Sequence, residues 1–302
     1  MVYDTGAGAA LCSEAVAELV PGGTIDLFIL SHSDIDHIGA AQTILRDYKV
    51  LTILHPGDPR NGATIRKVRA AIKAEPGADV WNLSRRNLPF GTSFPLGTAT
   101  ITFVAGWSDA RKIYDADPPL DGASHKAERY NGISIVVRFD YGGHSVLLTG
   151  DTLGRIESPT RPDDRLCQYA ERKMVENVSR VPLRADVLVG QHHGSDDSSS
   201  NCFIKAVSPT WVVFSAGHEY RHPRQSTADR LIANGVDKDR ILRTDRGDRE
   251  PALRGKPRLN EWVYGSLRGC VDKPGDDDVE IRLSADPAAP VDVRYRQEKA
   301  GC

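Results

Sequence analysis

The sequence predicts a mixed α/β fold, and three observations support this. Short apolar runs of strand length alternate with amphipathic segments along the chain. The composition, with 40% apolar and 26% charged residues, is ordinary for a folded globular chain. The 302 residues allow two domains or one large layered domain, at roughly 150 residues per domain. No apolar run reaches the roughly 18 residues of a membrane helix, so we expect no membrane partner.

The elements can be placed in order from their apolar spacing. Residues 9–19 have apolar side chains at helical spacing, and Pro21-Gly22-Gly23 ends this helix. Further helices are predicted at 38–47, 62–74, 165–178 and 227–234. Buried strands are predicted at 25–30, 50–54, 99–104, 185–189 and 211–215. Gly142-Gly143 forms the turn of a hairpin between 133–139 and 145–148.

Two regions have a weaker pattern. Residues 107–130 are polar and show no clear period, which predicts a long loop. Beyond Arg246 the chain becomes polar and proline-rich, with short strands expected near 261–264, 279–283 and 291–295.

Charge and cysteine content narrow the possible functions. The net charge of -2 gives no global field that attracts nucleic acid, so metal ions or a local patch would have to supply positive charge. The five cysteines include no CxxC pair, which argues against a disulfide framework. No signal peptide opens the chain, and we therefore expect a reducing, cytoplasmic location.

The densest group of chemically active residues follows the predicted strand 25–30. His32, Asp34, Asp36 and His37 fall within six positions. On an extended segment His32 and Asp34 point the same way, because the side-chain period is two. The helix that follows brings Asp36 and His37 to a second point. This arrangement predicts two metal ions side by side.

The run resembles the HxHxDH signature of the metallo-β-lactamase superfamily, with Asp34 in place of the second His. That HxDxDH form is typical of the hydrolase domain of the ComEC-type competence DNA-uptake proteins. Matching motifs follow in order along residues 2–247. They are Tyr3-Asp4-Thr5-Gly6, Asn131-Gly132-Ile133-Ser134, Leu147-Leu148-Thr149-Gly150-Asp151, His192-His193-Gly194-Ser195, His222-Pro223 and Arg243-Thr244-Asp245-Arg246-Gly247.

The resemblance implies a four-layer αββα sandwich. Residues 1–247 would form the catalytic domain, and 248–302 a strand-containing extension of the same domain. The family has strands before the Asp4 motif that this chain lacks, so we expect an N-terminal truncation that leaves one sheet with an open edge. The extension or a second protomer should cover that edge, and we expect a homodimer.

The resemblance also implies a ligand set for two divalent ions. Asn131 stands where many relatives carry a metal-binding His. Mixed oxygen and nitrogen ligation shifts the preference toward manganese, with zinc still possible. Asp151 follows a glycine at a strand end, where its carboxylate can bridge two cations. The predicted ligands are His32, Asp34, Asp36, His37, Asp151, His192 and His222.

The predicted reaction is hydrolysis of phosphate esters, most of all phosphodiesters, with a hydroxide bound at a dinuclear site. Nuclease-type substrates, small or cyclic diesters and phosphotriesters all fit. We assign catalytic roles to Asp36 and to His193, the latter as the general acid for the leaving group. Asn131, Ser195 and His125 are candidates for substrate binding. Two alternatives stay open: a lactonase or β-lactamase, and a non-catalytic, metal-bound DNA-binding module.

Overall fold

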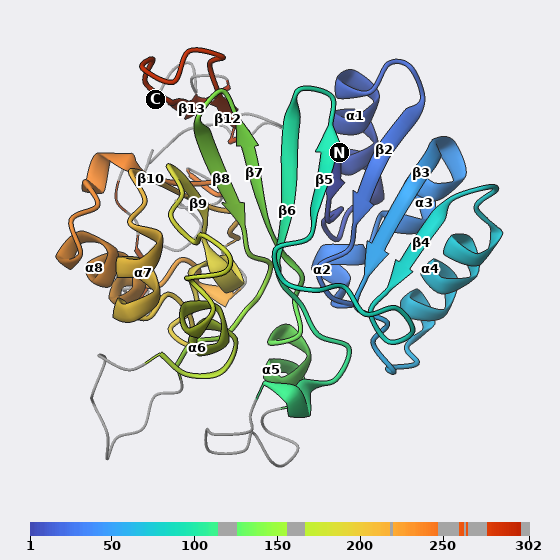
Figure 1. The fold of residues 1–302 in the computed structure, drawn as a ribbon, viewed down its shortest axis with the longest axis horizontal. Helices are drawn as coiled ribbons and strands as arrows, with labels where there is room; N and C mark the ends of the chain where they lie inside the picture. The colour runs from blue at the N-terminus through green and yellow to red at the C-terminus, as the bar shows by residue number, and fades with distance from the viewer. Residues whose placement is uncertain are drawn as a thin grey trace, which may run out of the picture.

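The computed structural model describes residues 1–113, 126–155, 167–217, 220–246, 260–262, 264 and 277–296. Two β-sheets face each other, and helices cover both outer faces (Figure 1). The αββα sandwich expected from the motifs is therefore confirmed.

The first sheet is parallel and has the order β1-β2-β3-β4. Its strands are β1 (Val2–Tyr3), β2 (Thr24–Ile29), β3 (Lys49–His55) and β4 (Asp79–Asn82). Helices α1 (Ala9–Leu19), α3 (Ala41–Asp47) and α4 (Ala63–Ala74) lie on its outer face (Figure 1). Buried Phe28, Ile44 and Val68 belong to the core between these helices and the sheet. The short helix α2 (Ile35–Ile38) follows β2 directly.

The second sheet is mixed and has the order β11-β10-β9-β8-β7-β6-β5. The strands β5 to β8 pair antiparallel, whereas β8 to β11 pair parallel. Their bounds are β5 (Ser93–Leu96), β6 (Ala99–Ala105), β7 (Val136–Tyr141), β8 (His144–Leu148), β9 (Val187–Val189), β10 (Trp211–Phe214) and β11 (Ile241–Arg243). Helices α6 (Tyr169–Glu176), α7 (Asn201–Val207) and α8 (Gln225–Ala233) cover its outer face (Figure 1).

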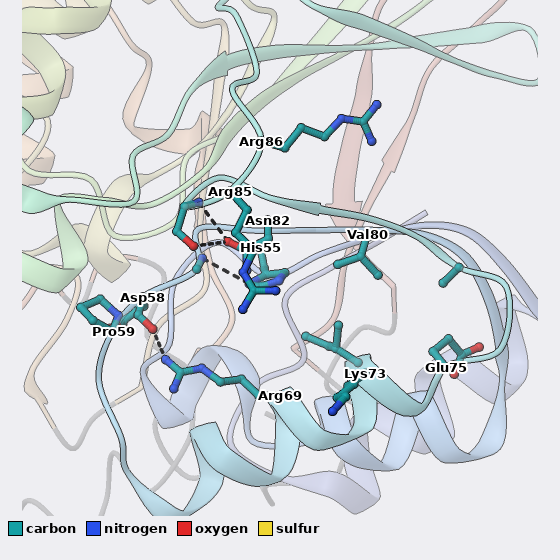
Figure 2. Close-up of a pocket in the computed structure, with 14 residues that line it drawn as sticks. His55, Asp58, Pro59, Arg69, Lys73, Glu75, Val80, Asn82, Arg85 and Arg86 are labelled. Carbon is teal, nitrogen blue, oxygen red and sulfur yellow. Dashed lines mark hydrogen bonds between the residues drawn. The ribbon is translucent and has the colours of Figure 1, made fainter.

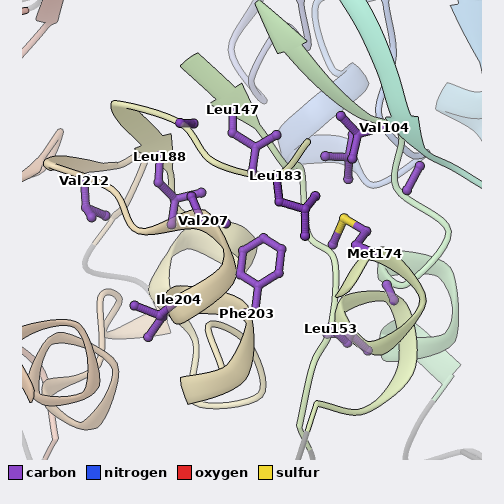
Figure 3. Packing of buried hydrophobic residues seen from close by; sticks show 14 of the residues in the cluster. Val104, Leu147, Leu153, Met174, Leu183, Leu188, Phe203, Ile204, Val207 and Val212 are labelled. Carbon is purple, nitrogen blue, oxygen red and sulfur yellow. The ribbon is translucent and has the colours of Figure 1, made fainter. Parts of the chain in front are cut away.

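Alternation along the strands divides the core in two. Leu147 faces the helices, where it joins Met174, Leu183 and Phe203 in the largest apolar cluster (Figure 3). Its neighbour Leu148 packs on the opposite face, which is shared with the first sheet. Because both faces of the central strands are buried, the carboxyl ends of β2, β8 and β9 are held at one edge of the sandwich.

The C-terminal strands β12 (Val279–Arg282) and β13 (Asp292–Tyr295) form an antiparallel hairpin. Val293 of the hairpin packs with Val146, Val187 and Val213 on the inner face of the second sheet. The hairpin thus covers strands that the smaller first sheet does not reach. It does not pair with β1, and its described link to that side is an ion pair between Arg296 and Glu18. The described residues of the extension therefore do not cover the edge of β1, and whether another part of the extension or a second protomer covers it stays a prediction.

Several elements differ from the predictions. Part of the expected loop 107–130 is helix α5 (Lys126–Asn131), with a short 3-10 turn at Ala110–Lys112. The predicted helix 38–47 is interrupted after α2 and resumes as α3. Of the expected strand near 261–264, the described residues include Glu261, which forms a bridge with Arg224, and residue 263 lies outside the described ranges. His125 lies outside the described residues.

Cysteine pairing is the clearest correction. Cys167 and Cys202 form a disulfide between the segment before α6 and the helix α7. Thirty-five residues separate them, so no local spacing pattern indicated the pair. Among the described residues Cys12 is a free thiol. In the same described ranges, no helix has the length and apolar character needed to cross a membrane.

Candidate metal centre

The first half of the site is built where β2 ends. Asp34 keeps an extended backbone, and α2 begins at the next residue. This change of conformation turns His37 back toward His32, so that their ring centroids lie 4.1 Å apart. Both imidazoles are buried. The residues of the predicted cluster lie together, but His37 lies beside His32 rather than only with Asp36 at a separate point.

Asp151 enters from the second sheet. Gly150 has a φ of +52°, and a Cβ there would lie 2.9 Å from the Cβ atoms of Ser31 and Ser134. Glycine therefore permits both the turn after β8 and the close approach to β2. The Asp151 carboxylate, 3% exposed, places Oδ1 3.1 Å from His37 Nε2 and Oδ2 3.7 Å from His32 Nε2.

The paired histidines after β9 supply the other side. His192 and His193 have φ values of +45° and +55°, a left-handed conformation that non-glycine residues rarely adopt. This backbone directs His193 Nε2 to within 3.3 Å of Asp36 Oδ2 and 3.5 Å of Asp151 Oδ2. His193 Nδ1 donates to the Ser215 carbonyl oxygen at 2.5 Å. Nε2 is therefore the nitrogen of His193 that faces the cluster.

His192 has a different environment. Its Nδ1 donates to Asp197 Oδ1 at 2.8 Å, and its Nε2 lies 3.0 Å from the side-chain nitrogen of Asn131. Nε2 lies 3.9 Å from Asp151 Oδ2. His192 therefore lies next to the cluster, and the Asp197 carboxylate keeps a proton on its Nδ1.

Asp34 is held by a cation that the sequence did not indicate. Arg60 forms an ion pair with Asp34 and a second one with Asp58, at 2.6 Å from Nε to Oδ2. Its guanidinium lies 4.1 Å from the centroid of the Tyr130 ring. Asp34 Oδ2 is 3.8 Å from His32 Nε2. Asp34 thus contacts both the cluster and a fixed positive charge.

Residues behind the cluster orient it. His37 Nδ1 donates to Asp4 Oδ2 at 2.8 Å, and Asp4 Oδ1 accepts from the Ser31 amide at 2.7 Å. Because Nδ1 is occupied in this way, Nε2 of His37 faces Asp151 and His193. The Tyr3-Asp4-Thr5-Gly6 motif was noticed in the sequence, but its orienting role was not.

The side chains perturb one another strongly. Burial opposes ionisation of Asp151, yet His37, His193 and His192 together hold its pKa well below the usual range. Burial opposes a charge on His193, but the carboxylates of Asp151 and Asp36 outweigh it and raise the pKa of His193 to about 10. Burial likewise opposes a charge on Asp36, but His193 and His37 outweigh it and lower the pKa of Asp36 to about 2. Burial, helped by the neighbouring His37, keeps the pKa of His32 well below its normal value. His32 is therefore neutral near pH 7, with a free lone pair.

This donor set fits divalent cations. Two groups each place three ligand atoms within 4.8 Å of one another: His32, His37 and Asp151, and then Asp36, His37 and His193. His32 Nε2 is buried and has no hydrogen-bond partner. A buried imidazole nitrogen without a partner is unfavourable unless a cation takes its lone pair. The groups share His37, which places two candidate positions side by side.

Other predicted residues lie around this core. The His222 ring is 5.9 Å from the His192 ring and 6.4 Å from the His193 ring, and it belongs to neither three-residue group. Burial and the two histidines lower its pKa to about 4. Ser195 donates its amide to the His192 carbonyl, a contact that supports the turn.

Comparison with known proteins settles the family. Residues 1–218 match the metallo-beta-lactamase superfamily. The chain belongs to this superfamily. Proteins of this superfamily are generally metal-dependent hydrolases. Among solved structures it is similar to the metallo-beta-lactamase fold protein YhfI from Bacillus subtilis. That comparison covers 80% of this chain and 82% of YhfI, with 15% identity and a TM-score of 0.41.

Curated relatives confirm the ComEC-type resemblance. ComE operon protein 3 of Bacillus subtilis is 28% identical over 232 residues, which are 73% of this chain and 24% of that protein. Recombination protein 2 of Haemophilus influenzae is 28% identical over 238 residues, 76% of this chain and 24% of that protein. This metallo-β-lactamase-superfamily chain therefore spans about a quarter of the length of these relatives.

Proposed function

We propose that this chain is a metal-dependent hydrolase, and specifically a phosphodiesterase with a dinuclear metal centre. The observation that carries the proposal is the position of Asp151. Its carboxylate lies between His32 and His37 on one side and His193 on the other, within 3.1–3.7 Å of all three. A single carboxylate in contact with both ligand groups suits a bridging role.

The residues divide naturally between two ions. The two three-residue groups overlap at His37, whose Nε2 can bind one ion. We therefore assign Asp36, His37 and His193 to one ion and His32 with the neighbouring Asp34 to the other, and we place Asp151 between them. Bound manganese or zinc would activate water and neutralise charge on the phosphoryl oxygens. Three carboxylates in the set favour manganese over an all-imidazole zinc site, and two ions per chain are expected.

The geometry suggests exchanging the roles expected for the paired histidines. His193 Nε2 lies among the ligand atoms, whereas His192 has Asp197 behind it and Asn131 in front. Against burial, Asp197 and Asp151 raise the pKa of His192 to about 9. We propose that His193 is a ligand and that His192 holds the proton for the leaving group. His222, Ser195 and Asn131 then line the approach of the substrate.

Arg60 extends the proposal to anionic esters. Asp34 and Asp58 both pair with its guanidinium, and its buried Nη2, which has no hydrogen-bond partner, is the donor that a phosphate oxygen can accept from. The names of two relatives, a recombination protein and a competence protein of Neisseria gonorrhoeae that is 37% identical over 117 residues, support a nucleic-acid-derived substrate. Small or cyclic diesters and phosphotriesters also present phosphoryl oxygens to such a site, so we retain them as candidate substrates.

A substrate panel tests the function. Protein reconstituted with manganese or with zinc would be assayed on a phosphate monoester, diester and triester, a lactone and a β-lactam. We expect the diester to be turned over most efficiently, and an oligonucleotide to be cleaved. Turnover of the lactone or β-lactam without diester hydrolysis would overturn the proposal, and so would metal binding without any turnover.

Two further proposals concern the state of the protein. The outer edge of β1 carries no further strand in the described part of the chain, so we propose a homodimer joined there, which light scattering would test as a doubled mass. The Cys167–Cys202 disulfide removes the basis for a cytoplasmic location, and we propose an oxidising compartment instead. Labelling of both cysteines by a thiol reagent without a reductant, in protein from its native host, would contradict this.

A further inference from the structure

A second cavity lies outside the metal centre, between α4 and the strands β3 and β4 (Figure 2). Its volume is about 660 Å³, which is within the range of pockets for small molecules. Apolar Ile72, Ala78 and Val80 line part of it, and polar and charged side chains line the rest. The lining residues come from the first sheet and its helix, so none of the metal-ligand groups takes part.

The charge of the side chains that line this pocket is net positive. Arg69, Lys73 and Arg85 line it, and within the described residues none of the three forms an ion pair with a carboxylate. The two acidic residues of the lining are already engaged. Asp58 is paired with Arg60, and Glu75 accepts from the Val50 amide at 2.8 Å.

His55, which lines the same pocket, adds a neutral hydrogen-bond donor. His55 Nδ1 accepts from the Gly57 amide at 3.2 Å, which leaves the ring proton on Nε2. Burial, with Arg69 and Arg85 close by, lowers the pKa of His55 to about 4, so the ring stays neutral. Arg86 also lines the pocket, but it is paired with Asp79 at 3.0 Å and stacks on Trp81 at 3.1 Å from the ring centroid.

The wall around this donor is rigid. Gly57 has a φ of +74°, and a Cβ at this position would collide with Asn82 and Ser84. Asn82 Oδ1 accepts from both the amide and the hydroxyl of Ser84, at 2.9 and 2.7 Å. Arg69 donates to the Asp58 carbonyl oxygen, which holds its guanidinium against this wall (Figure 2). The pocket is therefore preformed rather than dependent on loop closure.

The pocket adjoins the metal centre. A small void of about 20 Å³ is lined by His32 and Ser33 on one side. The same void is lined by His55, Asp58 and Arg69, which also line the larger pocket. A ligand in the pocket would therefore lie behind His32 while being held by different residues.

We propose that this pocket is a binding site for the phosphate groups of a nucleotide-sized ligand. Two guanidinium groups and an ammonium group are the donors that bind phosphate oxygens most strongly, and the apolar residues can receive a sugar or base. The ligand is either a free nucleotide or one unit of a nucleic-acid strand. The site is independent of the proposed hydrolysis.

Calorimetric titration of metal-free protein tests this inference, because chelation removes the metal centre as a competing phosphate site. The probes are thymidine 5′-diphosphate and a 5′-phosphorylated thymidine tetranucleotide at low salt. Lys73→Ala and Arg85→Ala should each weaken binding by roughly tenfold or more, the usual effect of losing a charge-assisted hydrogen bond. Lys67→Ala is the matched control, since Lys67 is an exposed cation of the same helix and does not line the pocket.

Each outcome decides the inference. Binding of the diphosphate alone, weakened by both pocket variants, supports a free nucleotide, and stronger binding of the tetranucleotide supports a strand. Failure of both probes to bind, or equal weakening by Lys67→Ala, overturns the site. Turnover of bis(p-nitrophenyl) phosphate by the metal-loaded pocket variants is expected to stay unchanged. Because the titration uses no activity readout, absence of turnover would refute the proposed function and leave the pocket result intact.

Discussion

The carboxylate of Asp151 contacts more of the candidate centre than any other side chain described above. It is nearly inaccessible to water, and three imidazoles hold it ionised against its burial. A buried carboxylate in such a position either neutralises cationic histidines or bridges metal ions. These two roles predict different consequences when it is removed.

Asp151→Ala should lower the metal content from two ions per chain toward one and remove most of the activity, because the bridging ligand is lost. Metal content measured by mass spectrometry, together with diester turnover, checks this. Asp140→Ala is a suitable control, since Asp140 lies on the same sheet in a peripheral ion pair with Arg138. A variant that retained two ions and normal turnover would show that Asp151 is not the bridge.

The paired histidines give a second prediction at this scale. His193→Ala should lose one metal ion. His192→Ala should keep both ions and much of its turnover of aryl esters, whose leaving groups need little protonation. Its turnover of alkyl or nucleoside diesters should fall roughly 10²–10⁴-fold, the usual effect of losing a positioned acid. Asp197→Asn should produce a milder form of the same selective loss, through the His192 tautomer.

The opposite result would support the roles predicted from the sequence, with His192 as a metal ligand and His193 as the general acid. In that case His192→Ala would lose metal, and His193→Ala would lose only the turnover of poor leaving groups. The comparison of aryl with alkyl substrates separates an acid from a purely structural residue, because a structural defect would reduce both rates equally.

At the scale of elements, the helices that have a local sequence pattern could be predicted from the sequence. The helix at residues 9–19 was predicted with the bounds that α1 has, because apolar spacing and a Pro-Gly-Gly stop are both local signals. The seven residues of α7 were missed, although Phe203, Ile204 and Val207 are buried. A helix this short is stabilised by tertiary packing rather than by its own propensity, so it leaves little periodicity to detect.

The site residues also differ in whether a local sequence motif indicates them. His32, Asp36, His37, Asp151 and the His192-His193 pair were identified from strand-end motifs, and the fold brings them together. Arg60 and Asp197 were not identified, since each acts through a partner distant in sequence or through a turn that the residues alone do not specify. The Cys167–Cys202 pair is a contact of this kind as well.

The contact between α6 and the segment before α7 gives a prediction about pH. Glu171 is fully buried and accepts from the Ser199 and Ser200 amides and from Gln191. Burial outweighs these hydrogen bonds and raises the pKa of Glu171 from 4.5 to about 7. The folded state therefore binds a proton more tightly than the unfolded state. This contribution to stability is fully present below pH 4.5 and is lost as pH rises to about 7.

The expected loss is about 3 kcal/mol, at 1.36 kcal/mol for each unit of pKa difference. Chemical denaturation of wild type and of Glu171→Gln between pH 4.5 and 8 measures it. The variant cannot ionise at this position, so the difference in unfolding free energy between the two proteins should change by this order across the range. Parallel pH profiles would show that Glu171 is ionised throughout.

At the scale of the whole molecule, the two faces of the second sheet have unequal coverage. Helices α6, α7 and α8 cover its outer face (Figure 1). On the inner face, the first sheet covers one part and the hairpin of β12 and β13 covers another. Phe139 and Leu148 pack against both apolar clusters of this face, so the two parts form one continuous apolar layer. The C-terminal strands should therefore unfold together with the rest of the chain rather than as a separate module.

Val293→Ala tests this coupling. Val293 is 5% exposed and packs with Val146, Val187, Val213 and Leu242. Removing two buried methyl groups and leaving a cavity should lower the free energy of unfolding by about 2 kcal/mol. Because the layer is shared, the variant should still unfold in one transition at lower denaturant, whether followed by fluorescence or by circular dichroism. Val178→Ala, at a position 45% exposed, should have little effect. A separate early transition in the Val293 variant, with the main transition unmoved, would show that the hairpin is an independent unit.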